Sequence, residues 1–211
     1  MRIHKLLLTL LVGLTLSAPI AYGSATPAAP ADASSSAAPA GDASTTGEYS
    51  PQSREYHLKA AFLRYVAKFV DWPAGAITSG SINICILGLV PSFEAINSIN
   101  GKDANDKTIT ITKILDLKAA KGHCHILFVS KTEEDNIKKI VSTVQDLPIL
   151  TFGDMDHFAE KGGDMNFYVL NNRLAIMINP SSVEKAHLKI GERMLKVVTI
   201  LPPIDQSGRP S

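Results

Sequence analysis

The sequence has no excess of charge of either sign, since its 211 residues carry 21 Lys and Arg against 20 Asp and Glu. A near-neutral chain has no broad attraction for phosphate backbones or for anionic lipid. Aromatic residues make up only 6% of the chain, and no basic stretch carries the interleaved aromatics that bind nucleic acid. We therefore expect no nucleic-acid partner.

Known catalytic and cofactor-binding motifs are missing as well. The chain contains no Gly-x-Ser-x-Gly elbow, no phosphate-binding loop and no Gly-x-Gly-x-x-Gly after its first predicted strand. Gly88 does follow that strand, but Leu89-Val90-Pro91 comes next, which is wrong for a dinucleotide-binding turn. The absence of these motifs lowers the expectation of catalytic activity, and we expect no cofactor.

The first fifty residues predict export. Arg2 and Lys5 stand before a short apolar run, 6–16, and the small residues Ala21 and Gly23 suit cleavage by a signal peptidase near Gly23. The apolar run is too short for a comfortable membrane span, so we expect no direct membrane insertion. The protein is therefore expected to work outside the cytoplasm.

Composition divides the chain into four parts. Residues 1–23 are predicted to be the signal peptide. Residues 24–50 are predicted to be a disordered Ala/Pro/Ser linker, because they offer too little apolar surface to bury. The segment 51–203 is long enough for one domain with its own core, and residues 204–211 are predicted to be a disordered tail. Removing the signal peptide lowers Lys and Arg from 21 to 19 against 20 Asp and Glu, which leaves a net charge of about −1.

Apolar runs that alternate with amphipathic stretches predict an α/β fold. Helices are expected over 51–71, 92–99, 131–144 and 155–160. Strands are expected over 82–87, 108–112, 124–129 and 148–152, with a hairpin of 167–170 and 174–178. Near-continuous apolar strands separated by helices are typical of a parallel sheet. We therefore predict a single compact domain with a mostly parallel sheet, helices on both faces and an antiparallel hairpin at the edge.

Cys85 and Cys124 are the only cysteines, and each lies in a predicted strand. An even pair in an exported domain usually forms a disulfide. The residues alone also allow two buried thiols or a redox switch, because pairing needs neighbouring positions on one face of the sheet. No metal site is predicted at His123-Cys124-His125, since strand alternation places Cys124 on the face opposite the two histidines and no second cluster completes a site.

An acidic cluster follows the strand predicted over 148–152. Asp154 and Asp156 fall in the first turn of the predicted helix, where the helix dipole favours negative charge. Capping therefore explains these carboxylates without a metal or an acid–base role. A hydrolase of unrecognised type around Asp154 and Asp156 stays open as a third hypothesis, although no nucleophile accompanies them.

An ordered set of motifs resembles the YfiR family. The motifs are residues 55–63 and 68–73, Ile84-Cys85-Ile86-Leu87-Gly88, Asn100-Gly101-Lys102, residues 124–130, Leu150-Thr151, Phe158-Ala159 with Gly162-Gly163, and residues 172–179. No single piece is decisive, but their order and spacing agree over residues 54–198. The long linker departs from the family's usual short lead, and this chain has one cysteine pair where some members have two.

The resemblance implies a periplasmic regulator, not an enzyme, with an α/β fold that tends to form homodimers. Family members repress an inner-membrane diguanylate cyclase by binding its periplasmic sensory domain, which lowers cyclic-di-GMP and biofilm formation. Stress or reducing conditions release this repression. The family's first cysteine pair falls on Cys85 and Cys124, so the resemblance also implies a disulfide between them that stabilises the inhibitory form.

The candidate partner-binding residues lie on and just after the first predicted helix. Tyr56, Phe62, Tyr65 and Trp72 are more aromatic than one buried stripe needs, and aromatic side chains anchor protein interfaces. The alternative is that all four belong to the core, as helix stripes commonly do.

The second function hypothesis is a periplasmic sensor that binds a small ligand. Sheets of this class bind ligands at the carboxyl ends of their strands. Here those ends are Gly88, Ser130, and Gly153 with Asp154, where small residues leave room and backbone amides are available. A ligand would raise the melting temperature, whereas a module that binds only a protein partner would not respond to metabolites.

Overall fold

The computed structural model describes residues 49–202. The predicted signal peptide, residues 24–48 of the predicted linker and the predicted tail lie outside these residues. The helices are α1 (Pro51–Phe69), α2 (Phe93–Asn97), η1 (Leu117–Ala120), η2 (Lys131–Asn136), α3 (Ile137–Val144), α4 (Pro180–Lys185) and α5 (Glu192–Leu195), where η marks a 3-10 helix. The strands are β1 (Val70–Asp71), β2 (Ser81–Leu87), β3 (Asp103–Ala104), β4 (Lys107–Ile114), β5 (Ile126–Val129), β6 (Leu150–Gly153), β7 (Met165–Leu170), β8 (Arg173–Ile178), β9 (Lys189–Ile190) and β10 (Thr199–Ile200).

Eight of the strands form one mostly parallel sheet in the order β10-β8-β7-β6-β5-β2-β4-β3. The run from β4 through β2, β5 and β6 to β7 is parallel throughout. β7 and β8 form the predicted antiparallel hairpin, and the two-residue strand β10 pairs with β8 beyond it. Asn171 and Asn172 make the hairpin turn with φ values of 49° and 60°, which short hairpins require and which asparagine tolerates.

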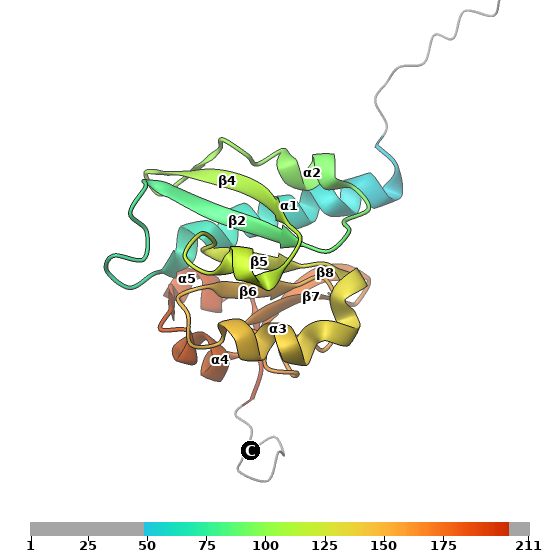
Figure 1. Cartoon of the computed structure of the whole chain (residues 1–211). Helices are drawn as coiled ribbons and strands as arrows, with labels where there is room; N and C mark the ends of the chain where they lie inside the picture. Colours follow the sequence, from blue (N-terminus) through green and yellow to red (C-terminus); the bar gives the residue numbers. More distant parts are fainter. Residues whose placement is uncertain (1–48, 203–211) are drawn as a thin grey trace, which may run out of the picture. The chain divides into compact units, whose positions relative to one another are not determined.

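Strand alternation divides the core into two clusters on opposite faces of the sheet. Ile84, Ile86 and Phe128 belong to the cluster on the side of α1, α2, α4 and α5. Cys85 and Leu127, their neighbours along the strands, belong to the cluster on the side of η1 and α3. Figure 1 shows α1 behind the sheet and α3 in front of it. The predicted α/β fold, with helices covering both faces, is confirmed.

Helix α1 begins at Pro51, as the sequence predicts, and ends two residues before its predicted end. The Ser50 hydroxyl accepts a hydrogen bond from the Ser53 N–H at 3.1 Å, and Pro51 occupies the first turn, where no intrahelical donor is needed. The helix ends at Phe69, and the chain then extends into β1, which pairs with β9. The apolar face of α1 buries Leu63 and Val66 completely. This packing fixes α1 against the sheet.

The prediction of a helix over residues 155–160 is wrong. These residues form successive turns, and His157 adopts a φ of 62°, which a helix does not permit. The ring of Phe158 packs against Gly153 and Gly163, where an added Cβ would lie 2.4 Å and 2.1 Å from ring atoms. Burial of this ring therefore sets the path of the chain, and local helix propensity does not.

The helix predicted over residues 131–144 forms in two parts. Its first turns are the 3-10 helix η2, and α-helical geometry begins only at Ile137. The Glu133 carboxylate accepts from the Asn136 side chain at 2.9 Å. The Ser130 hydroxyl caps η2 by accepting from the Thr132 N–H at 3.4 Å.

Candidate functional site

Three parallel strands end level with one another at one edge of the sheet. Leu87 of β2 is in register with Val129 of β5, which is in register with Gly153 of β6. The chain continues the pairing for one more residue, since the Ser130 N–H donates to the Leu87 carbonyl at 2.9 Å and the Asp154 N–H donates to the Val129 carbonyl at 2.8 Å. Residues after β2, β5 and β6 are thereby brought together, as the carboxyl-end rule predicts.

A cavity of about 540 Å³ opens at this edge, and we call it the strand-end cavity. Its walls come from the first turns of α1, the β7–β8 hairpin, and the segments that follow β2, β5 and β6. The lining residues are Gln52, Glu55, Tyr56, Lys59, Leu89, Pro91, Ser130, Lys131, Thr132, Asp154, Met155, Asp156, Phe167, Tyr168, Val169 and Leu174. Its volume lies within the range of about 300–1,000 Å³ that is typical of ligand sites.

A buried ion pair lines the strand-end cavity. Lys59 and Asp154 are only 6% and 7% exposed, and Lys59 Nζ lies 2.6 Å from Asp154 Oδ1. Glu55, one turn earlier in α1, lies 2.5 Å from the same ammonium. The Tyr56 hydroxyl donates to Asp154 Oδ2 at 2.6 Å. Both carboxylate oxygens of Asp154 are therefore satisfied, which a buried charge requires.

Tyr56 also provides an aromatic face for the ammonium group, since Lys59 Nζ lies 4.4 Å from the centroid of its ring. Burial raises the pKa of the Tyr56 hydroxyl above its usual value, and the hydrogen bond and negative charge of Asp154 raise it further. The hydroxyl therefore stays protonated and remains a donor to Asp154. This arrangement fixes the first half of α1 to the end of β6.

Exposed apolar side chains stand at the mouth of the strand-end cavity. Leu89 is 77% exposed and Val169 is 69% exposed. The Leu89 backbone is held on both sides: its carbonyl accepts from the Ser130 hydroxyl, and its N–H donates to Thr132 Oγ1 at 3.0 Å. A fixed backbone with a solvent-exposed apolar side chain is suited to binding a further molecule.

The structure separates the four predicted ligand-binding residues into two kinds. Ser130 and Asp154 line the strand-end cavity, although their side chains already bond within the protein. Gly88 and Gly153 do not border open space. An added Cβ at Gly88 would lie 2.6 Å from Thr132 Oγ1, and one at Gly153 would meet the Phe158 ring. These glycines allow close packing behind the cavity, and ligand binding by the four residues stays a prediction.

The four predicted partner-binding aromatics lie along the whole of α1. Tyr56 is buried and lines the strand-end cavity, whereas Trp72 follows the far end of the helix and lines a separate cavity of about 290 Å³. With a rise of about 1.5 Å per residue, the helix extends about 20 Å beyond Tyr56. Phe62, Tyr65 and Trp72 are partly buried and pack on the core. The four therefore do not gather into one patch, and partner binding by them stays a prediction.

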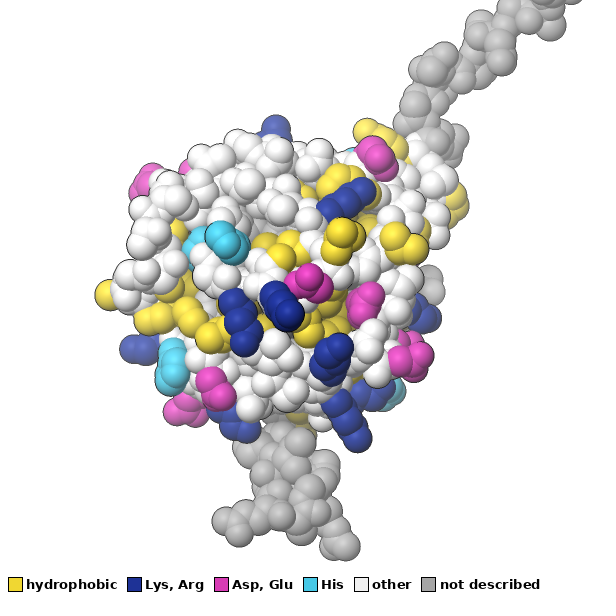
Figure 2. All heavy atoms as spheres, viewed as in Figure 1, with side chains coloured by type: hydrophobic (Ala, Val, Ile, Leu, Met, Phe, Trp, Pro, Cys, Tyr) yellow, Lys and Arg dark blue, Asp and Glu magenta, His cyan; other side chains and the backbone are white. Residues whose placement is uncertain are grey.

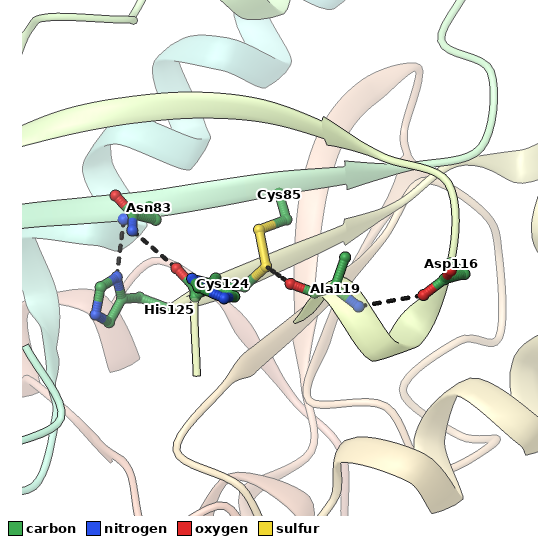
Figure 3. The surroundings of a disulfide bond; sticks show 7 residues. Asn83, Cys85, Asp116, Ala119, Cys124 and His125 are labelled. Atoms are coloured by element: carbon green, nitrogen blue, oxygen red, sulfur yellow. Dashed lines mark hydrogen bonds between the residues drawn. A yellow bond between two sulfur atoms is a disulfide. The ribbon is translucent and has the colours of Figure 1, made fainter. Parts of the chain in front are cut away.

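Cys85 and Cys124 form a disulfide, which confirms the predicted pairing. Their Cα atoms lie 5.7 Å apart, and both residues are buried in the cluster beneath η1 and α3. Cys124 Sγ lies 4.0 Å from the Ala119 carbonyl oxygen, while Asp116 caps η1 by accepting from the Ala119 N–H. Figure 3 shows this chain of contacts from β2 to η1. The disulfide therefore ties the segment between η1 and β5 to β2.

The acidic residues near the strand ends serve separate partners. Asp164 is buried and accepts from the N–H and the hydroxyl of Thr151 at 2.7 Å and 2.8 Å, and burial raises its pKa. Glu160 pairs with the His157 ring at 2.9 Å, and Asp154 pairs with Lys59. Within residues 49–202, no three His, Cys, Asp or Glu side chains are placed to hold a metal ion.

Sequence reasoning missed Lys59, which lies on the buried face of α1 between Tyr56 and Leu63. One signal was available, because Glu55 stands one turn before Lys59 and such pairs interact on a helix. The second partner, Asp154, lies far away in the sequence and carries no local signal.

The architecture is that of a single-domain α/β protein with a mostly parallel sheet. A family model described as YfiR/HmsC-like matches residues 56–199, and the chain belongs to this family. It is a family of periplasmic regulatory proteins and not of catalysts. The resemblance seen in the sequence motifs is thereby confirmed.

Among solved structures, the chain is similar to the crystal structure of a conserved domain protein from Vibrio cholerae O1 biovar El Tor. The identity is 10% and the TM-score is 0.48, and the match covers 69% of this chain and 59% of that one. No curated protein matches the chain significantly.

The surface carries both kinds of charge. On the face drawn in Figure 2, Lys and Arg side chains and Asp and Glu side chains are both present, with hydrophobic side chains among them. This face therefore offers no continuous basic stripe of the kind that follows a nucleic-acid backbone. Among residues 49–202, no helix has both the length and the apolar character needed to cross a bilayer.

Proposed function

We propose that this protein binds the periplasmic sensory domain of an inner-membrane diguanylate cyclase and represses the enzyme, which lowers cyclic-di-GMP and biofilm formation. The observation that carries the proposal is the family match over residues 56–199, which includes nearly all of the folded part. The proposal also takes the protein to be exported by its signal peptide and to act as a homodimer.

The strand-end cavity supports a binding role through its shape and chemistry. It joins exposed apolar side chains at its mouth, Leu89 and Val169, to a fixed ionic group in its wall, Lys59 with Asp154. Interfaces commonly place apolar anchors beside a few oriented polar groups. The cavity is therefore one candidate surface for the partner, and the aromatic residues of α1, with Trp72, are the other.

The first test is capture of membrane proteins from the native host with the tagged exported protein. The proposal predicts that a diguanylate cyclase is captured and that its activity falls when the protein is added. Capture of no cyclase, or capture without any loss of cyclase activity, would contradict it.

Variants at the two candidate surfaces then locate the contact. Leu89→Ser combined with Val169→Ser tests the strand-end cavity, and Trp72→Ala tests the far end of α1. Leu115→Ser is the matched control, because Leu115 is 99% exposed and lies outside both surfaces. The variant that loses cyclase capture while keeping its melting temperature identifies the surface, and loss of capture with Leu115→Ser would show that any exposed leucine has the same effect.

Reductant tests the role of the disulfide in this function. The proposal expects weaker repression when Cys85–Cys124 is reduced, because the segment between η1 and β5 then loses its covalent tie to β2. Capture that does not change with reductant would leave the disulfide with a purely structural role.

A small-ligand sensor is the second candidate function, and the strand-end cavity is the observation that favours it. A ligand that binds the folded state raises the melting temperature by mass action. A metabolite panel should therefore contain a compound that stabilises the wild-type protein but not Leu89→Ser with Val169→Ser. A panel without such a compound would count against this candidate and leave the protein partner as the function.

A further inference from the structure

The imidazole ring of His125 joins three separate parts of the fold. His125 stands immediately before β5, and its Nδ1 atom lies 2.8 Å from the backbone nitrogen of Asn83 in β2. Its Nε2 atom lies 3.2 Å from the carbonyl oxygen of Ala76, and the ring of Trp72 meets it edge-on with the centroids 6.2 Å apart. Figure 3 shows the ring beside Asn83, away from the disulfide. The residue is 8% exposed.

These partners fit only one form of the ring. The Asn83 N–H is a donor, so Nδ1 must accept, and the single proton of the neutral ring resides on Nε2 and is donated to the Ala76 carbonyl. A second proton would go to Nδ1, where it would face the Asn83 N–H donor to donor. The protonated ring therefore cannot keep this position without leaving a buried N–H unsatisfied.

The segment that the ring holds has few other polar ties. Residues 72–77 lie between β1 and β2, outside any helix or strand. The Ala76 N–H closes a turn onto the Pro73 carbonyl at 3.0 Å, and the Ala76 carbonyl accepts from His125. The Trp72 indole N–H is buried and finds no hydrogen-bond partner within the described part of the chain. Packing and the bond to His125 therefore hold this segment in place.

We propose that His125 is an acid-sensitive latch. While the ring is neutral it holds residues 72–77 against the sheet, and its protonation releases this segment together with the Trp72 side chain.

Charged neighbours do not explain the state of the ring. Asp71, beside Trp72, and His123, two residues before His125, are both exposed, and Lys107 lines the cavity that Trp72 borders. Within residues 49–202, no ion pair involves His125. Burial therefore decides which form of the ring is stable.

The sign of the pH dependence follows from that burial. Desolvation lowers the pKa of His125 from 6.5, and the hydrogen bond to the Ala76 carbonyl opposes this in part. The unfolded or released ring takes up a proton more readily than the latched ring. The stabilisation is therefore complete above pH 6.5 and is lost as the pH falls below 6.5 through the pKa of the latched ring.

The chain provides its own reporter, because Trp72 is its only tryptophan. We would titrate the exported protein from neutral to acid pH and follow the emission maximum and the quenching of Trp72 by acrylamide, with far-UV circular dichroism on the same samples. The latch predicts a shift of emission to longer wavelength and stronger quenching below pH 6.5, with the circular dichroism unchanged. NMR of the His125 ring nitrogens should show the proton on Nε2 at neutral pH.

Two variants test the assignment to His125. In His125→Gln the amide can accept from Asn83 and donate to Ala76 at every pH, so the Trp72 transition should disappear. His123→Gln is the matched control, because His123 is exposed and should leave the transition unchanged. The proposal is overturned if the wild type shows no transition, if His125→Gln keeps it, or if circular dichroism is lost together with the shift in emission.

A consequence for regulation rests on the proposed function. Trp72 is one of the predicted partner-binding residues, so release of its segment would make partner binding sensitive to acid. The fluorescence experiment needs no partner. Failure of the latch and failure of the proposed function can therefore be told apart.

Discussion

The Lys59–Asp154 ion pair offers the sharpest test of the energetics of the strand-end cavity. Asp154→Asn keeps the size of the side chain and an oxygen that can accept from the Tyr56 hydroxyl, but it removes the negative charge from a buried ammonium. Removing one member of a buried pair costs about 3–5 kcal/mol. Glu55 continues to face Lys59, but it is half exposed and so screened by solvent, which places the expected loss near the lower limit, at about 3 kcal/mol.

Equilibrium unfolding in urea measures this loss. With a slope of about 2 kcal/mol per molar urea, a destabilisation of about 3 kcal/mol moves the midpoint down by about 1.5 M. Asp156→Asn is the matched control, since Asp156 is an exposed acid two residues away, and we expect its effect to stay within about 0.5 kcal/mol.

A double variant separates the charge from the packing. Lys59→Met with Asp154→Leu removes both charges and keeps apolar contacts, and replacing a buried ion pair in this way is often neutral. The double variant should therefore be more stable than Asp154→Asn alone. If Asp154→Asn unfolds at the same urea concentration as the Asp156→Asn control, the ion pair does not stabilise the fold and the reasoning fails.

Three further predictions concern stability. Replacing Cys85 and Cys124 by Ala should lower the free energy of unfolding by about 4 kcal/mol, from the loop-entropy relation for a cross-link of this span. Urea unfolding of the reduced wild type should show the same loss. An unchanged urea midpoint would contradict this prediction. Gly153→Ala should lower the free energy of unfolding by at least about 2 kcal/mol, because its Cβ would lie 2.4 Å from the Phe158 ring. In the control Gly122→Ala the added Cβ meets no atom within 4 Å, so the loss should be only about 1 kcal/mol, from the positive φ. Equal melting temperatures for the two variants would refute the packing argument. Thermal unfolding at several pH values should show that His125→Gln loses less stability than the wild type as the pH falls below 6.5, and parallel curves would contradict the burial of a neutral ring.

Local sequence patterns were sufficient to predict the fold class, because strand alternation and helix periodicity are properties of neighbouring residues. Ile84 and Ile86 face one cluster and Cys85 and Leu87 face the other, as a strand buried on both faces requires. The start of α1 at Pro51 follows from a cap and a proline that act within one turn. Such features can be read from sequence without knowledge of the remainder of the chain.

The segment after β6 shows where local reading fails. Its acids and its predicted first turn favour a helix over 155–160, but the ring of Phe158 is buried against Gly153 and Gly163, and the backbone turns to place it there. The energy of burying an aromatic ring exceeds the small differences in helix propensity between residues. The path of this segment was therefore decided by packing.

The candidate site likewise has one part that the sequence predicts and another that depends on tertiary packing. The sequence by itself determined that β2, β5 and β6 would end near one another, because parallel strands separated by helices have this topology. Only the tertiary structure brought Asp154 onto Lys59 and Tyr56, which stand almost one hundred residues earlier, and placed His125 between Asn83 and Ala76. Ion pairs and buried hydrogen bonds depend on distances between atoms that are remote in the chain, and these distances exist only after the sheet and α1 have packed together.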